Sequence, residues 1–237
     1  MFKIDYLKTL LFQRILVPAY SRWVRFKAEW LGMGQRDWTK EDVELIRAHW
    51  GQRHHERNYF VCDKIAQFYP ASVLEIGCGC GNILYLLAKQ FPLIQITGIE
   101  INPVAVRCGT EWIKEEHISN VSLQEGRAER LTSVADKNFD VVFSCAALMY
   151  VTPDHIRDVL WNMIRLSQKA VLLVEMHEET MKKYLGEFHL PNNWKRDYRK
   201  IFNEIGLNDD RIRIEPIPER LWQPGGGGAT YIEVRTG

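Results

Sequence analysis

The stretch that most constrains the fold of this 237-residue chain is VLEIGCGCGN, residues 73–82. The β-forming residues Val73 and Leu74 lead into three glycines that alternate with cysteines, and the apolar segment ILYLLAKQF follows with hydrophobic residues at helical spacing. This order predicts a buried strand, a tight glycine turn and the start of a helix. Because glycine has no Cβ atom, we expect the turn to bring backbone N–H groups and a helix N-terminus against a ligand.

The spacing of the glycines and the acid before them distinguish two classes of ligand. Dinucleotide-binding turns follow the pattern G-x-G-x-x-G and hold a pyrophosphate at the helix start. Here Gly77, Gly79 and Gly81 give G-x-G-x-G, and Asn82 stands where the dinucleotide pattern has its last glycine. Glu75 precedes the turn, and a carboxylate there can accept hydrogen bonds from an ammonium group but would repel a phosphate. The turn therefore favours a ligand that carries a cation.

A second acid follows in PLIQITGIEINP, residues 92–103. This segment predicts a strand that ends on Glu100, then Asn102 as a helix cap and Pro103 at the first helical position. A strand–helix–strand unit with an acid at the tip of its second strand is one half of a nucleotide-binding fold. An ionised carboxylate accepts two hydrogen bonds side by side, so we expect Glu100 to bind both ribose hydroxyls. Ile101 would then offer an apolar face to the adenine.

Later segments continue the alternation of strands and helices. VSLQEG (121–126) and AVLLVEM (170–176) predict further strands, and FDVVFSCAALMYV (139–151) predicts a strand and the loop after it. The segment 170–176 is almost continuously apolar, as is typical of the centre of a parallel sheet. RIRIEPI and TYIEVRT predict a closing antiparallel pair. Asp140 is predicted to be structural, at the start of its strand. Ser144 lies at a carboxyl strand end, where ligands collect in open α/β sheets.

Four ordered features together resemble the class I S-adenosylmethionine-dependent methyltransferases. They are the E/D-x-G-x-G-x-G turn, Glu100, the loop GRAERL that is similar to the family's G-D-A-E-x-L, and the F-D-x-V strand at Phe139. The resemblance covers about residues 55–235. It implies an α/β fold with a Rossmann-like, doubly wound, mostly parallel seven-stranded sheet and an antiparallel C-terminal hairpin. We expect an N-terminal helical extension or lid over residues 1–52 and the methyltransferase domain over 53–237.

The resemblance implies S-adenosylmethionine as the cofactor. Arg127 departs from the family pattern, because arginine cannot accept a hydrogen bond from the adenine amino group where the usual aspartate can. That contact must come from Glu129, from a backbone carbonyl or from nothing, and Arg127 is left to stack over the ring or pair with a neighbouring acid. The residues implied for cofactor binding are Glu75, Gly77, Cys78, Gly79, Gly81, Glu100, Ile101, Ala128, Glu129 and Ser144.

The acceptor side is less defined by the sequence. The fourth strand ends in Ser-Cys-Ala, and not in the Asn/Asp-Pro-Pro-Tyr of enzymes that methylate amino groups of DNA and glutamine. The chain also lacks the acidic cluster of magnesium-dependent enzymes, so we expect no metal and a small-molecule or lipid-like, amphiphilic acceptor. His177, beyond the fifth strand, is the candidate general base, with Glu175 and His55 as alternatives. Pocket candidates are His55, Tyr59, Tyr150 and Tyr198.

Two other functions share the same sequence pattern. A non-catalytic S-adenosylmethionine-binding module would keep the fold and lose turnover. An NAD-dependent oxidoreductase would share the strand–helix–strand unit, but the glycine spacing and the closing hairpin argue against it. With formal net charge +1, no general affinity for nucleic acid is expected.

Residues 1–36 form a basic, aromatic-rich amphipathic segment with seven lysines and arginines against two acids. Such a segment either packs its apolar side on its own domain or lies in a membrane interface as a peripheral contact. No apolar run is long enough to span a bilayer, and there is no signal-peptide pattern. The odd number of cysteines, five, without a C-x-x-C pair favours a reduced, cytoplasmic setting.

Overall fold

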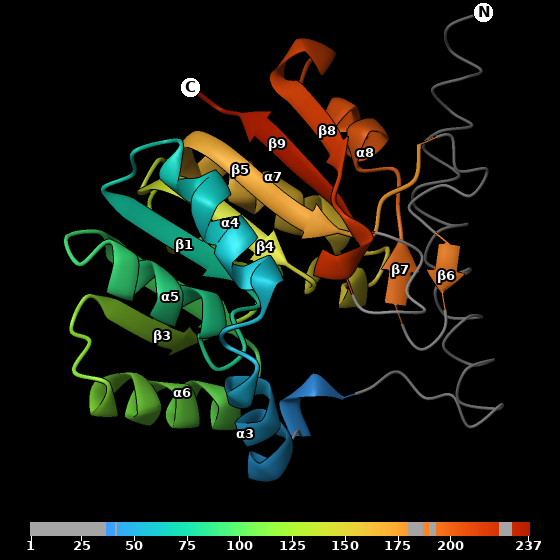
Figure 1. Ribbon diagram of the computed structural model, residues 1–237. Coiled ribbons are helices and arrows are strands. Elements are labelled where there is room, and N and C mark those ends of the chain that lie inside the picture. The colour runs from blue at the N-terminus through green and yellow to red at the C-terminus, as the bar shows by residue number, and fades with distance from the viewer. Residues whose placement is uncertain (1–36, 41, 180–186, 190–192, 223–228) are drawn as a thin grey trace, which may run out of the picture.

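The computed structural model of the protein describes residues 37–40, 42–179, 187–189, 193–222 and 229–237 (Figure 1). The basic segment 1–36 and the glycine run 225–228 lie outside the described residues. The division of the chain at residue 52 therefore stays a prediction.

A seven-stranded sheet forms the centre of the molecule, in the order β3-β2-β1-β4-β5-β9-β8. Its first five strands along this order pair in parallel, and β9 pairs antiparallel with both β5 and β8. The predicted mixed sheet with a closing antiparallel hairpin is confirmed. The strands are β1 (Ser72–Ile76), β2 (Gln95–Glu100), β3 (Val121–Glu125), β4 (Phe139–Cys145), β5 (Ser167–Glu175), β8 (Ile212–Pro216) and β9 (Thr230–Arg235).

Helices cover both faces of this sheet, as the predicted doubly wound fold requires. Side chains alternate along β4, so that Val141 and Phe143 pack with α4 and α5 while Val142 packs with α7 and α8. In Figure 1, α4 and α5 lie on the near face of the sheet. The helices are α3 (Val43–Gly51), α4 (Glu56–Ala66), α5 (Asn82–Gln90), α6 (Pro103–Glu115), α7 (Ile156–Leu166) and α8 (Tyr198–Glu204).

Several short elements complete the described chain. The strands β6 (Glu187–His189) and β7 (Asn193–Lys195) pair with each other outside the main sheet. The 3-10 turns that matter for the cavity are η2 (Trp38–Lys40), η3 (Ala128–Arg130), η4 (Leu148–Tyr150) and η6 (Glu219–Leu221). No helix within the described ranges is long and apolar enough to cross a membrane.

The starts of the two helices before β1 differ from the sequence prediction. In the sequence, Thr39 and Asp42 form the S/T-x-x-D/E pattern that predicts a helix start at Thr39. In the structure Thr39 lies in η2, where its hydroxyl donates to the Asp37 carboxylate. Asp42 caps α3 instead, because its carboxylate accepts from the backbone N–H of Leu45 at 2.9 Å. For the next helix the sequence predicts about residues 54–69. The observed α4 is shorter, and His55 caps its start, because its Nδ1 accepts from the Arg57 N–H at 3.1 Å.

The order of the sheet determines where a ligand can bind. The chain runs from β1 outward to β2 and β3, then returns to β4 on the other side of β1. Diverging connections at such a reversal leave a crevice beyond the carboxyl ends of the two central strands. Asp140, at the opposite end of β4, accepts from the Ala71 N–H at 2.6 Å and lies 3.3 Å from Lys169 Nζ. Its predicted structural role is confirmed.

The glycine turn after β1 provides a test of this packing. Gly77 has a φ of +73°, and a Cβ atom added to it would lie 2.4 Å from the Ala147 Cβ. We expect Gly77→Ala to lower the free energy of unfolding by about 2–5 kcal/mol, because a left-handed backbone and an overpacked contact each destabilise. Urea denaturation measures the loss.

Gly79→Ala is the matched control for this substitution. Gly79 also has a positive φ, +54°, but no heavy atom lies within 4 Å of an added Cβ. The expected loss is therefore only about 1–2 kcal/mol, from backbone strain alone. Equal losses in the two variants would contradict the close contact between residues 77 and 147.

Candidate functional site

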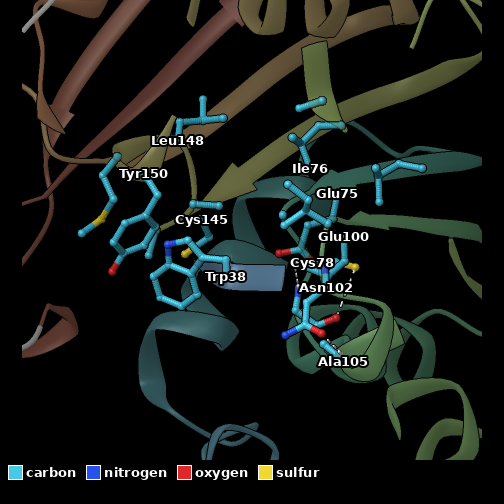
Figure 2. A pocket seen from close by; sticks show the side chains of 18 of the residues that line it. Trp38, Glu75, Ile76, Cys78, Glu100, Asn102, Ala105, Cys145, Leu148 and Tyr150 are labelled. Carbon is cyan, nitrogen blue, oxygen red and sulfur yellow. Dashed lines mark hydrogen bonds between the residues drawn. The ribbon is translucent and has the colours of Figure 1, made fainter. Parts of the chain in front are cut away.

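A cavity of about 1050 Å³ opens at the carboxyl ends of β1, β2 and β4. Its walls come from the glycine turn, the ends of β2 and β4, the loop after β3, and the segments before β1. In Figure 2, Trp38, Tyr150 and Cys145 lie on one side of the view, and Glu75 and Glu100 on the other. The volume reaches the upper end of the range for small-molecule sites, so the cavity can hold more than one small ligand.

The glycine turn is tied to the end of β2 by its own backbone. The N–H groups of Gly77 and Cys78 donate to the Ile99 carbonyl at 2.8 and 3.2 Å, and the Gly79 N–H donates to Glu100 Oε2 at 2.8 Å. We expected these N–H groups to face a ligand, and this prediction is wrong for all three, because each has a partner within the protein. The glycines serve instead to allow positive φ and a close approach of the backbone.

Helix α3 is held over this turn. The Asn82 side chain donates to the His49 carbonyl at 2.8 Å, and the Cys80 thiol lies 3.8 Å from the Ile46 carbonyl. Ile46 and His49 thereby enter the cavity wall. Asparagine at position 82 thus joins two helices, which a glycine could not do. The start of α4 contributes His55, Arg57 and Asn58 to the same wall, so helices before β1 do border the cavity, as the resemblance implies.

Glu75 carries the least satisfied charge of this site. The residue is only 3 % exposed, and its Oε2 atom is buried without a hydrogen-bond partner among the described residues. Burial raises the pKa of Glu75 well above its ordinary value, nearby Glu100 raises it further, and Arg57 opposes the shift. A buried carboxylate oxygen without a donor is unfavourable, so a ligand that brings an N–H group would be stabilised here.

Glu100 lies at the tip of β2, where the sequence placed it. Its Oε2 accepts from the Gly79 N–H, and its Oε1 accepts from the Asn102 N–H at 2.9 Å. Glu100 thereby ties the glycine turn to the start of α6, and it borders the cavity. Asn102 caps α6 by accepting from the N–H groups of Val104 and Ala105, as predicted.

The loop after β3 lines the same side of the cavity. Ile101, Ala128 and Glu129 border it, together with Arg127. Arg127 Nη1 lies 3.3 Å from Glu129 Oε1. Arg127 therefore pairs with a neighbouring acid, which is one of the two roles left open for it; the other was stacking over the adenine ring.

The end of β5 corrects the predicted catalytic residues. Met176 lines the cavity, and successive side chains of an extended chain point to opposite sides, so His177 and Glu175 face away from it. The Nδ1 atom of His177 accepts from the Tyr198 N–H at 3.2 Å, and burial lowers the pKa of the ring. The structure therefore does not place His177 as a general base. Glu175, fully buried, accepts from the Ser144 hydroxyl at 3.1 Å.

Four other predicted residues also lie outside the cavity lining. Ser144 is turned toward Glu175. Gly81 lies behind the turn, where an added Cβ would lie 3.0 Å from Ile113 Cδ1. Tyr59 is on the outer side of α4, with its hydroxyl 2.7 Å from His54 Nδ1, and Tyr198 is fully buried in α8. Of the acceptor-pocket candidates, the cavity brings together His55 and Tyr150.

Among the lining residues that sequence reasoning missed are Trp38, Arg57, Met149, Met176 and Trp222. The Trp38 and Tyr150 ring centroids are 4.4 Å apart, and the Arg57 guanidinium lies 5.3 Å from the Trp222 ring centroid. These contacts join distant parts of the chain, so no local pattern marks them. All five cysteines are free, and in the described ranges no group of three or more His, Cys, Asp or Glu side chains could hold a metal ion.

Comparison with known proteins is consistent with this geometry. Residues 73–170 match the family model described as "Methyltransferase domain". The trans-aconitate 2-methyltransferase of Enterobacter sp. (strain 638) is 27 % identical over 173 residues, covering 73 % of this chain and 58 % of that protein. Residues 73–170 thus resemble a domain of the class I S-adenosylmethionine-dependent methyltransferases. The cofactor that this type of domain takes as methyl donor is S-adenosylmethionine.

Other similarities support the same assignment of the fold. The trans-aconitate 2-methyltransferase of Escherichia coli O1:K1 / APEC is 22 % identical over 162 residues, or 68 % of this chain and 53 % of that one. The chain spans about half the length of the curated relatives it matches. Magnesium protoporphyrin IX methyltransferase from Synechocystis PCC 6803, solved with bound SAH, superposes with a TM-score of 0.59 at 13 % identity, covering 98 % of this chain and 100 % of that one.

The unpartnered carboxylate makes a prediction about stability. We expect Glu75→Gln to raise the free energy of unfolding of the ligand-free protein at neutral pH by about 1 kcal/mol or more, because it removes a buried charge. The raised pKa of Glu75 means that the folded state binds the proton more tightly than the unfolded state. Glu75 therefore does not lower the free energy of unfolding below its unfolded-state pKa. It lowers that free energy as the pH rises through its folded-state pKa.

The gain in Glu75→Gln should accordingly be small at about pH 5 and larger at about pH 8. Urea denaturation across this range measures it. Glu125→Gln, at an exposed carboxylate that ends β3, is the control and should show no such trend. A gain of equal size at both pH values would contradict the account of Glu75.

Proposed function

We propose that this chain binds S-adenosylmethionine in the cavity and transfers its methyl group to a small-molecule or lipid-like acceptor. The observation that carries this proposal is the pairing of two buried carboxylates at the switch point of the sheet. Glu75 has a buried oxygen without a donor among the described residues, and Glu100 borders the same cavity at the tip of β2. A pyrophosphate at the glycine turn would be repelled by Glu75, whereas a cationic nucleoside brings a donor to Glu75 and a ribose diol to Glu100.

The amino-acid end of the cofactor fits the charges around Glu75. This end is a zwitterion, with an ammonium group and a carboxylate. Glu75 would accept from the ammonium, and Arg57, which lines the cavity and has a buried, unpartnered Nε among the described residues, would donate to the carboxylate. The opposite charges of Glu75 and Arg57 already influence one another. Gly77, Cys78 and Gly79 would pass beneath this part of the cofactor.

The nucleoside end would extend toward α6. Glu100 would accept from the two ribose hydroxyls, and Ile101 and Ala128 would contact the adenine ring. Glu129 could accept from the adenine amino group with the oxygen that Arg127 does not occupy. Gly81 and Ser144, which do not line the cavity, would support the site without touching the cofactor.

The reaction would be a direct in-line displacement. The acceptor's lone pair forms the new bond to the methyl carbon, the bond from that carbon to sulfur breaks, and sulfur keeps the electron pair as S-adenosylhomocysteine leaves. Holding the two reactants aligned can contribute roughly 7 kcal/mol or more. A base is needed only if the acceptor arrives protonated. Of the three predicted bases, His55 is the one that lines the cavity. Its Nδ1 accepts from the Arg57 N–H, so Nε2 carries the proton of the neutral ring, and His55 would take a proton at Nδ1 only after this hydrogen bond opens.

The walls away from the cofactor residues indicate the kind of acceptor. Aromatic and thioether side chains contribute to them, from Trp38, Met149, Tyr150, Met176 and Trp222. Such walls favour an acceptor with an apolar or planar body. The names of the relatives span trans-aconitate and magnesium protoporphyrin IX, so they do not narrow the acceptor further.

Glu100→Ala tests the cofactor site. We expect it to weaken S-adenosylhomocysteine binding by about 1.5–3 kcal/mol, the usual contribution of hydrogen bonds to a charged group. Isothermal titration calorimetry measures the affinity. The matched control is Glu125→Ala, because Glu125 lies directly opposite Glu100 in the β2–β3 ladder but outside the cavity lining. Unchanged affinity in folded Glu100→Ala would remove this residue from the site.

The same variants extend the test to turnover. The parent protein, incubated with methyl-labelled S-adenosylmethionine and a metabolite or lipid extract, should transfer label to small molecules. Glu125→Ala should retain this activity, and Glu100→Ala should lose it at low cofactor concentration. Binding without any transfer would instead support a non-catalytic module, and binding of NADH but not of S-adenosylhomocysteine would overturn both.

A further inference from the structure

One backbone turn forms the wall between the glycine turn and the aromatic side of the cavity. We call residues 147–151 the wall turn; it contains η4, and all of its residues line the cavity. On one side Ala147 meets Gly77, where an added Cβ would lie only 2.4 Å from the Ala147 Cβ. On the other side Tyr150 contacts Trp38. The wall turn therefore touches both the proposed cofactor side and the proposed acceptor side.

The N–H groups at the start of the wall turn all point to one carboxylate. The backbone N–H groups of Ala147, Leu148 and Met149 donate to Glu175 at 2.9, 2.9 and 3.2 Å. Glu175 is fully buried, at the end of β5. A negative charge at this end of a helical turn is favourable, because the exposed N–H groups of the turn carry partial positive charge.

The carbonyl groups at the other end are held by a buried cation. Arg196 Nη1 donates to the Leu148 carbonyl at 2.9 Å, and Nη2 donates to the Val151 carbonyl. Arg196 is fully buried, and its own backbone N–H and carbonyl bind Met176 and Glu178 beyond the end of β5. The wall turn thus lies between a carboxylate on its N–H side and a guanidinium on its carbonyl side, in the orientation that favours both charges.

The wall turn depends on Glu175 and Arg196 because it has few hydrogen bonds within itself. It is a single 3-10 turn, entered through Ala146, which has a φ of +56° although it is not a glycine. Isolated turns of this kind have few internal hydrogen bonds and are stabilised mainly by their surroundings. Neither Glu175 nor Arg196 lines the cavity, so a ligand contact does not explain why two buried charges meet here.

We propose that Glu175 and Arg196 are positioning residues that fix the wall turn, and with it Met149 and Tyr150, against the methyl acceptor. The inference rests on the proposed function. In-line transfer depends on alignment, and a displacement of about 1 Å can lower a rate by about 100-fold. The two charges act through the backbone of the wall turn, without touching cofactor or acceptor.

Amide hydrogen exchange of the parent protein, followed by NMR, is the first test. The amides of Ala147, Leu148 and Met149 should exchange about as slowly as those of the central strand β4. The Arg196→Lys variant keeps the charge but cannot donate to both carbonyls in the same geometry. Its wall-turn amides should exchange at least about 10-fold faster. Fast exchange in the folded parent protein would overturn the proposal even if no variant folds.

Arg165→Lys is the matched control. Arg165 also donates through both Nη atoms to backbone carbonyls, those of Val134 and Leu131 at 2.7 Å each, in a loop outside the cavity lining. It should lose stability in the same way and leave wall-turn exchange and turnover unchanged. Glu175→Gln is the second test variant, because it removes the charge and sets an amide NH2 group against the three N–H donors.

Three readouts separate positioning from a general structural role. For Arg196→Lys and Glu175→Gln we expect S-adenosylhomocysteine affinity within roughly 3-fold of the parent, while labelled methyl transfer at saturating cofactor falls about 10-fold or more. Equal loss of transfer in Arg165→Lys, or a parallel loss of S-adenosylhomocysteine affinity, would overturn the proposal. So would faster exchange with unchanged transfer. A parent protein that binds S-adenosylhomocysteine and transfers nothing would contradict the proposed function, and the exchange data would still decide whether these two residues fix the wall turn.

Discussion

The tie between the glycine turn and the end of β2 is the interaction on which the rest of the site depends. Ile99 accepts two N–H groups from the turn, and Glu100 accepts a third. Because β1 and β2 are joined at their carboxyl ends in this way, the carboxylates of Glu75 and Glu100 are fixed in one cavity. Helix α3 is then fastened over the turn through Asn82 and Cys80. The glycine turn therefore fixes both the position of α3 in the cavity wall and the positions of the two carboxylates.

The site contains buried charge that the fold alone does not satisfy. Glu175 accepts three backbone N–H groups and a hydroxyl, so its burial is compensated by structure. Glu75 is buried to a similar extent and keeps an oxygen without a donor among the described residues. The contrast separates a carboxylate whose hydrogen bonds come from the fold from one that still lacks a donor for one oxygen. Unsatisfied polar groups of this kind are typical of functional sites, where binding supplies the missing partner.

Much of the fold could be predicted because its signals are local. The order of strands, the closing hairpin, the Asn102 cap and the acids Glu75 and Glu100 each follow from a short pattern. Which side chain at the end of β5 faces the cavity could not be predicted in this way, because it depends on strand register. Met176 therefore lies where His177 or Glu175 was expected. Ser144 pairs with Glu175 on the neighbouring strand for the same reason. Trp38, Arg57 and Trp222 meet only through tertiary packing, which leaves no mark in the sequence.

The central claim is that Glu75 and Glu100 are the two anchors of one S-adenosylmethionine site. A crystal structure of the full chain soaked with S-adenosylhomocysteine tests it most directly. The account predicts the cofactor's ammonium within hydrogen-bond distance of the Glu75 oxygen that now lacks a donor, and both ribose hydroxyls on Glu100. A nucleoside bound elsewhere in the cavity, or a Glu75 oxygen still without a partner in the complex, would contradict it.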